Sequence, residues 1–119
     1  MTQPLDDAPK TDLTLAQLQG AVDAWISKWG YWSPLANLAR LTEEVGELAR
    51  EINHAHGEKP KKGDEPEGRV AEELADVLFV VITLANSMDI DLTEAFTQVM
   101  QKYNIRDATR WSPKGSGEE

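Results

Sequence analysis

The sequence predicts an all-α protein whose four helices form a four-helix bundle-like domain. Four segments carry apolar residues at the three- and four-residue spacing of an amphipathic helix, whereas no segment alternates with the period of two typical of a strand. The length of 119 residues corresponds to one domain with a single core. One longer loop, over 59–68, is rich in proline, glycine and charge and separates the second segment from the third.

The first two predicted helices have recognisable ends. A capping-box pattern at Thr14 opens the first helix, whose apolar positions continue to Trp29 before Gly30 ends it. The Ser-Pro pair at 33–34 supplies a cap and a favourable first position for the second helix, which ends at Gly57. Both segments are therefore expected to be amphipathic helices joined by a short turn.

The third and fourth helices differ in the width of their apolar faces. The third, from about Arg69 to Met88, has an unusually wide apolar arc, so we expect it to be the most buried helix. Asp91 is placed to cap the fourth helix. Its predicted buried face comprises Leu92, Phe96, Val99, Met100 and Tyr103.

The two ends of the chain differ in composition from its middle. Residues 1–12 and 112–119 are rich in proline, glycine, serine and charge, and they offer too little apolar surface to offset the entropy of ordering. We expect two flexible tails around a single helical domain over 13–111.

Charge and composition exclude several classes of function. Twelve basic against twenty-one acidic residues give a net charge of −9, which disfavours nucleic acids and anionic membranes as partners. The chain has no cysteine, which excludes disulfides and cysteine-based metal sites. Its apolar stretch 77–85 is shorter than the roughly 18–20 residues needed to cross a bilayer, so we expect no membrane span. We expect a cytoplasmic protein, in which an anionic substrate requires a local positive group such as a metal ion.

Two pairs of carboxylates are spaced to lie together on helix faces. Glu44 and Glu47 are three residues apart on the second predicted helix, and Glu73 and Asp76 are three apart on the third. If the two helices face each other, four oxygen donors meet, and Mg²⁺ and Mn²⁺ are bound by such oxygen ligands. The same residues are also compatible with an acidic, solvated surface, and the spacing alone leaves both interpretations open.

Longer motifs around these pairs carry a family resemblance. TEEVGE supplies Glu43, Glu44 and Glu47, and EELAD supplies Glu72, Glu73 and Asp76 and is followed by the apolar run VLFVVITLAN. A basic pair four residues apart, Lys102 and Arg106, lies in QKYNIR. In these three motifs and their order, the sequence resembles the short, single-domain MazG-type nucleoside triphosphate pyrophosphohydrolases, which have an all-α fold.

The resemblance implies an enzyme, a reaction and a role for each motif residue. A metal-dependent hydrolase would convert a (deoxy)nucleoside triphosphate and water to the monophosphate and pyrophosphate, as nucleotide-pool housekeeping. Mg²⁺, or Mn²⁺ in its place, would be bound by Glu44, Glu47, Glu73 and Asp76. The further catalytic residues implied are Glu43 and Glu72, which would bind another ion or orient water, and Lys102 and Arg106, which would hold the triphosphate. The resemblance also implies a homo-oligomer, either a dimer or a tetramer.

Other polar and aromatic side chains are candidates for contact with the substrate. An indole can stack on a nucleobase, although core packing is the more frequent role of a tryptophan. A lysine of the 59–68 loop can bind phosphate, and asparagines near helix ends can bind substrate or cap the helix. The candidates are Trp32 (with Trp29 and Trp111 as alternatives), Lys59, Asn86 and Asn104.

Two other functions fit parts of the pattern. The chain could be a helical interaction module whose acidic faces are solvated and whose apolar arcs bind a partner. It could also be a related carboxylate–metal enzyme that acts on dUTP, dUDP or a phosphoribosyl nucleotide. Base and sugar preference depend on the shape of a pocket, which helical periodicity does not determine.

Overall fold

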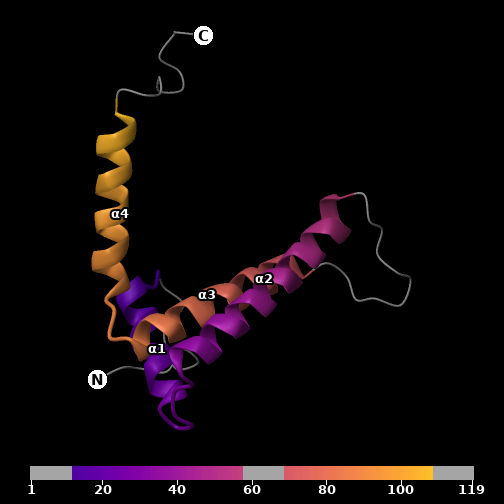
Figure 1. Cartoon of the computed structure of the whole chain (residues 1–119), viewed down its shortest axis with the longest axis horizontal. Coiled ribbons are helices and arrows are strands. Elements are labelled where there is room, and N and C mark those ends of the chain that lie inside the picture. Colours follow the sequence, from indigo (N-terminus) through magenta and orange to yellow (C-terminus); the bar gives the residue numbers. More distant parts are fainter. Residues whose placement is uncertain (1–11, 58–68, 109–119) are drawn as a thin grey trace.

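The computed structural model describes residues 12–57 and 69–108 and contains four helices in this part of the chain (Figure 1). They are α1 (Leu15–Ile26), α2 (Pro34–His56), α3 (Val70–Ser87) and α4 (Leu92–Asp107). The all-α prediction is confirmed. The predicted tails, apart from Asp12, and the predicted 59–68 loop lie outside the described residues.

The predicted helix caps are present. Thr14 and Gln17 make the reciprocal bonds of a capping box, and the Ser33 side chain accepts a hydrogen bond from the N–H of Ala36. The Asp91 carboxylate accepts hydrogen bonds from two N–H groups in the first turn of α4. These bonds satisfy amide groups that have no partner within the helix, which is why the sequence signals located the starts correctly.

The first helix ends earlier than predicted. Helix α1 ends at Ile26, not at Trp29, and residues 27–29 form a turn. The N–H of Gly30 closes this turn by donating to the Ile26 carbonyl at 2.9 Å, and Gly30 has a φ of +88°. That left-handed conformation favours glycine, so Gly30 ends the helical segment as predicted. The three residues before it, 27–29, form the closing turn and are not part of the helix.

Helices α2 and α3 form an antiparallel pair, and α1 packs across α3 near its C-terminal end (Figure 1). The core consists of Val22, Ile26 and Ile82, with Phe79 and Tyr31 packed against it. As predicted, α3 contributes most of the buried residues of the described chain, namely Glu73, Val80, Ile82, Thr83 and Ala85. No helix in the described ranges is long and apolar enough to span a membrane.

Helix α4 contradicts the predicted buried face. It projects away from the α2–α3 pair and contacts α1 near its start, and none of its residues is buried (Figure 1). Of the five side chains predicted to pack inward, Leu92 is partly buried and packs against the core. The other four are accessible, with Phe96 60% exposed and Tyr103 45% exposed. The apolar periodicity is present, but beyond Leu92 none of the helices in the described ranges covers this face. The four helices therefore do not close into a bundle within one chain.

The tryptophans are also more accessible than the core-packing expectation. Trp25, Trp29 and Trp32 are 52%, 73% and 58% exposed. Trp25 packs edge-on against Trp29 and against the partly buried Phe79, so Trp25 and Trp29 lie at the surface beside the core instead of filling it. Trp111 lies outside the described residues. The core-packing expectation is wrong for the three described tryptophans.

Gln19 of α1 connects this helix by hydrogen bonds to the end of α3 and the start of α4. The Gln19 amide donates to Asn86 Oδ1 and to the Ile90 carbonyl, both at 2.9 Å, and its oxygen accepts from the N–H of Leu92 at 2.9 Å. Asn86 in turn donates to the Gln19 carbonyl at 2.9 Å. These four bonds connect residues about seventy positions apart in the chain.

Replacing Gln19 by alanine should destabilise the protein by about 2–3 kcal/mol, because it leaves the Leu92 N–H without its acceptor and Asn86 Oδ1 without its donor at a partly buried junction. Gln101→Ala removes an exposed glutamine from α4 and is the matched control, with an expected change below about 0.5 kcal/mol. Chemical denaturation measures both. Equal effects of the two substitutions would contradict this role of Gln19.

Candidate metal centre

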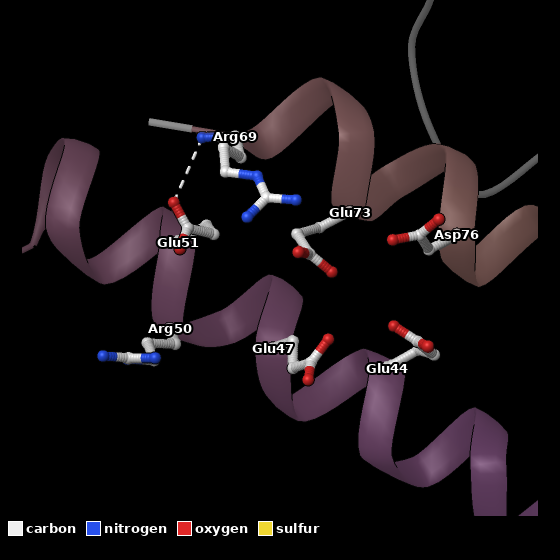
Figure 2. Close-up of a pocket in the computed structure, with 7 residues that line it drawn as sticks. All are labelled: Glu44, Glu47, Arg50, Glu51, Arg69, Glu73 and Asp76. Carbon is white, nitrogen blue, oxygen red and sulfur yellow. Dashed lines mark hydrogen bonds between the residues drawn. The ribbon is translucent and has the colours of Figure 1, made fainter. Parts of the chain in front are cut away.

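The four carboxylates singled out by the sequence meet between α2 and α3. Glu44 and Glu47 project from α2, and Glu73 and Asp76 project toward them from α3 (Figure 2). They line a pocket of about 400 Å³. The three-residue spacing places each pair on one face of its helix, and the packing of the two helices brings the pairs together.

Distances between carboxylate oxygens are short enough for shared coordination. One oxygen from each of Glu44, Glu47 and Glu73 lies within 4.8 Å of the others. A second group with the same spacing consists of Glu72, Glu73 and Asp76, so Glu73 belongs to both. Two overlapping sets of oxygen donors are a suitable environment for hard divalent cations.

Burial separates these carboxylates from an ordinary acidic surface. Glu73 is 7% exposed, and the side chain of Glu44 is 16% exposed. Glu44 Oε1 and Glu73 Oε2 are buried, and neither has a hydrogen-bond partner in the described part of the chain. Because a buried carboxylate oxygen without a partner is costly, these two atoms fit a cation better than they fit a solvated helix face.

The pKa values of two carboxyls reflect the same crowding. Burial raises the pKa of Glu44, and the hydrogen bond and negative charge of Glu47 raise it further. Burial also raises the pKa of Glu73, and the negative charges of Glu47 and Asp76 raise it further. Arg40 and Arg69 act in the opposite direction, on Glu44 and Glu73 respectively. A divalent cation would relieve this repulsion without protonating the carboxyls.

Three residues of the pocket were not among the predicted site residues, namely Arg50, Glu51 and Arg69. Glu51 accepts a hydrogen bond from the backbone N–H of Arg69 at 3.1 Å, which ties the end of α2 to the start of α3 (Figure 2). Helical spacing could have indicated Glu51, because it follows Glu47 by four residues and therefore shares its face. No sequence signal connects Arg69 to Glu51 across the intervening loop.

The two further acidic residues of the motifs have different surroundings. Glu72 belongs to the second carboxylate group and pairs with the Arg69 guanidinium. Glu43 is exposed and belongs to neither group. The structure thus brings Glu72, but not Glu43, to the carboxylate cluster.

The basic pair does not lie in the pocket of its own chain. Lys102, Asn104 and Arg106 are exposed on α4, which projects away from α2 and α3 (Figure 1). The Arg106 guanidinium donates two hydrogen bonds to Asp107, both 3.0 Å, and these bonds raise its pKa. It also lies over the Tyr103 ring.

The remaining substrate-contact candidates are dispersed. Asn86 lines a different pocket of about 400 Å³ beside α1, where its side chain is bonded to Gln19. Arg40 lies between Trp32 and the carboxylates. Its guanidinium carbon is 5.8 Å from the centre of the Trp32 ring, and its Nε is 3.9 Å from Glu44 Oε2. Lys59 lies outside the described residues.

Residues 32–111 match the MazG nucleotide pyrophosphohydrolase domain, which spans α2, α3, α4 and the whole carboxylate cluster. The chain belongs to the MazG nucleotide pyrophosphohydrolase family. The predicted family, reaction and enzyme class are confirmed by this match.

Two proteins of known sequence are similar over most of their length. YpjD of Bacillus subtilis (strain 168) is 54% identical over 109 residues, which cover 90% of this chain and 98% of YpjD. A dATP/dGTP diphosphohydrolase of Cyanophage S-2L is 31% identical over 105 residues, which cover 87% of this chain and 84% of the phage enzyme.

Solved structures of MazG proteins have the same fold. The crystal structure of YPJD from Bacillus subtilis matches with a TM-score of 0.72 and 55% identity, over 79% of this chain and 98% of YPJD. The Bacillus-conserved MazG protein, a nucleotide pyrophosphohydrolase, matches with a TM-score of 0.70 and 49% identity, over 86% of this chain and the whole of that one. The crystal structure of iMazG from Vibrio DAT 722 matches with a TM-score of 0.54 and 34% identity, over 76% of this chain and 99% of iMazG.

The raised pKa of Glu73 predicts a pH-dependent effect of Glu73→Gln on stability. A carboxyl whose pKa rises on folding stabilises the protein below its unfolded-state pKa, and this contribution is lost as pH rises through the folded-state pKa. In the metal-free MazG protein, the buried carboxyl becomes charged as pH rises through its raised folded-state pKa, whereas the glutamine stays neutral. We expect Glu73→Gln to unfold at a higher temperature than wild type in chelator at pH 8, by a margin that shrinks toward pH 4.

Two controls complete this measurement. Glu43→Gln makes the same change on an exposed carboxylate of α2 and should show no such pH-dependent margin. Added Mg²⁺ should stabilise wild type more than Glu73→Gln and so reduce or reverse the difference. A wild type that is the more stable protein at pH 8 in chelator would contradict uncompensated repulsion at Glu73.

Proposed function

We propose that this MazG protein is a Mg²⁺-dependent enzyme, with Mn²⁺ as a substitute, in which Glu44, Glu47, Glu73 and Asp76 are the metal ligands. The observation that carries the proposal is the pair of buried carboxylate oxygens, Glu44 Oε1 and Glu73 Oε2, that lack a hydrogen-bond partner among the described residues. Both belong to groups of oxygens that lie within 4.8 Å of one another. The donor set is all oxygen, which suits these two ions.

The reaction is hydrolysis between the α- and β-phosphates of a nucleoside triphosphate. The oxygen of water forms a bond to the α-phosphorus, the bond from that phosphorus to the bridging oxygen breaks, and pyrophosphate leaves with the bridging oxygen. A bound divalent cation would lower the pKa of water and offset charge on the phosphoryl oxygens. The chain's carboxylates hold and orient the ion, and no covalent nucleophile is required.

Glu72 and Glu43 are our candidates for a further ion or for orienting the attacking water. Glu72 is the better supported of the two, because its carboxylate belongs to the group with Glu73 and Asp76. It also pairs with Arg69, which lines the pocket. Glu43 is exposed on the adjacent position of α2 and would act only from outside that group.

We also propose that the enzyme is a homo-oligomer, a dimer or tetramer, in which α4 of one copy lies against another copy. The support is the uncovered apolar face of α4 and the exposed Trp29 and Leu35 near the start of α2. Apolar surface of this extent is typical of an interface. In such an assembly, Lys102, Arg106 and Asn104 would reach the triphosphate bound by a neighbouring copy.

Further substrate contacts complete the proposal. Trp32 would stack on the base, since its ring is exposed and close to Arg40 at the end of the carboxylate cluster. Lys59 would bind phosphate, and Asn86 would contribute from the junction with α1. We assign the catalytic domain to 13–111 and expect it in the cytoplasm, where nucleoside triphosphates are available, with neither nucleic acid nor membrane as a partner.

The test of the reaction is pyrophosphate release from the common ribo- and deoxyribonucleoside triphosphates, with Mg²⁺, with Mn²⁺ and with chelator. dATP and dGTP are included because the phage relative is a dATP/dGTP diphosphohydrolase. dUTP, dUDP and a phosphoribosyl nucleotide complete the panel. Metal-dependent formation of monophosphate and pyrophosphate supports the proposal, and release of orthophosphate alone contradicts it.

Glu47→Gln should abolish turnover while the helical circular-dichroism signal is retained. Glu47 lies at the centre of the pocket, and its removal as a ligand should cost at least the roughly 100-fold loss seen when an outer-shell partner of a metal ligand is removed. Thermal stabilisation by Mg²⁺ should fall in the same variant. Glu94→Gln, on exposed α4, is the control. Near-wild-type turnover in Glu47→Gln would show that Glu47 is not a ligand.

Phe96→Asp should dissociate the oligomer, because it places a charge on the uncovered apolar face of α4. The molar mass measured by light scattering should fall, and turnover should fall with it. The matched control is Gln98→Asp, two positions along the same helix and therefore on a different face. An unchanged mass for Phe96→Asp would contradict the assignment of this face to an interface.

A further inference from the structure

Two arginines occupy equivalent positions on the helices that carry the carboxylates. Arg40 precedes Glu44 by four residues on α2, and Arg69 precedes Glu73 by four residues at the start of α3. Because α2 and α3 are antiparallel (Figure 1), the same step along the sequence leads in opposite directions along the pocket. The two guanidinium groups therefore flank the row of carboxylates from its two ends.

The Arg69 end of the pocket is polar. The backbone of Arg69 is fixed by its hydrogen bond to Glu51, and its guanidinium contacts the Glu72 carboxylate while remaining 48% exposed. Figure 2 shows Arg69 and Glu51 together at one end of the pocket and Glu44 with Asp76 at the other. No described residue that lines the pocket is aromatic.

The end of the carboxylate row that lies beside Arg40 is aromatic, although its aromatic residues do not line the pocket itself. The guanidinium carbon of Arg40 lies 5.8 Å from the ring centres of both Trp32 and Phe79. Its contact with Glu44 is long, 3.9 Å from Nε to Oε2, so the rings rather than a tight ion pair orient the side chain. A guanidinium held in this way retains donors for a phosphate, which it can bind through two parallel hydrogen bonds.

The two ends match the two unlike halves of a nucleoside triphosphate. The leaving half is pyrophosphate, which is purely anionic and has no apolar surface. The other half carries a base, which stacks on aromatic rings, and a single phosphate. A polar end whose lining includes Arg50 and Arg69 suits the first half. Arg40, beside the exposed Trp32 and the partly buried Phe79, suits the second.

We infer that Arg40 and Arg69 set the direction in which the substrate lies across the carboxylates, with Arg69 binding the pyrophosphate half and Arg40 binding the α-phosphate of the nucleotide. This inference deepens the proposed function and rests on it. The scissile bond then lies between the two arginines, beside Glu47 and Glu73. Neither arginine forms a bond with phosphorus; each acts only through hydrogen bonds and charge.

A purely structural role of the arginines makes a different prediction. If each arginine only neutralised the neighbouring glutamate, its loss would alter the binding of Mg²⁺, and would therefore change the binding of both products to the same extent. If the arginines orient the substrate, each loss affects one product. The binding of the two separate products therefore distinguishes the two roles.

The experiment measures the equilibrium binding of pyrophosphate and of a nucleoside monophosphate by calorimetry, each in excess Mg²⁺, with wild type, Arg69→Gln and Arg40→Gln. The monophosphate is that of the triphosphate which wild type hydrolyses fastest. Arg69→Gln should weaken pyrophosphate binding about tenfold and change monophosphate binding less than about twofold. Arg40→Gln should show the opposite pattern. Arg69→Lys and Arg40→Lys, which keep the charge, should recover part of each loss.

Controls separate the possible failures. Lys28→Gln removes one positive charge from the exposed turn after α1 and should alter the binding of neither product. Equal weakening of both products by either arginine variant, or no weakening by either, overturns the assignment of direction. A folded wild type that releases no pyrophosphate from any nucleotide overturns the proposed function itself, and the inference with it.

Discussion

Repulsion among carboxylates held between α2 and α3 is the constraint on which the rest of this protein depends. Glu73 is buried, Glu44 is nearly so, and two of their oxygens lack partners in the described chain. Their raised pKa values show that the fold brings these groups together at an electrostatic cost. If a cation binds there, its binding free energy adds to the stability of the folded protein and offsets this cost.

The same cluster explains how an acidic protein can act on a polyanion. The net charge of −9 repels a triphosphate at long range, so binding depends on positive groups at short range. In our proposal, the cation lies among the carboxylates and arginines flank it, Arg40 beside an exposed indole and Arg69 at the polar end. Positive charge is thus confined to the site, where it both binds the substrate and distinguishes its two halves.

In our proposal, helix α4 connects catalysis with the association of copies. Its apolar face is regular in sequence but uncovered in one chain, and its basic residues Lys102 and Arg106 do not reach the carboxylates of that chain. Association of copies through this face would cover the apolar side chains and supply the missing phosphate contacts together. The exposed tryptophans near the start of α2 fit the same account, since a ring such as Trp32 can serve either a neighbouring chain or a base.

The sequence by itself determined the helices, the two carboxylate pairs and the family. Caps at Thr14 and Asp91 and the three-residue spacing of Glu44 and Glu47 are local features, governed by hydrogen bonds and geometry within a few residues. Only the tertiary structure decided which faces meet. The exposure of α4 and the approach of Arg69 to Glu51 depend on residues far apart in the chain. Periodicity shows that a helix has an apolar face, but the packing of other helices, in this chain or in another copy, decides whether that face is covered.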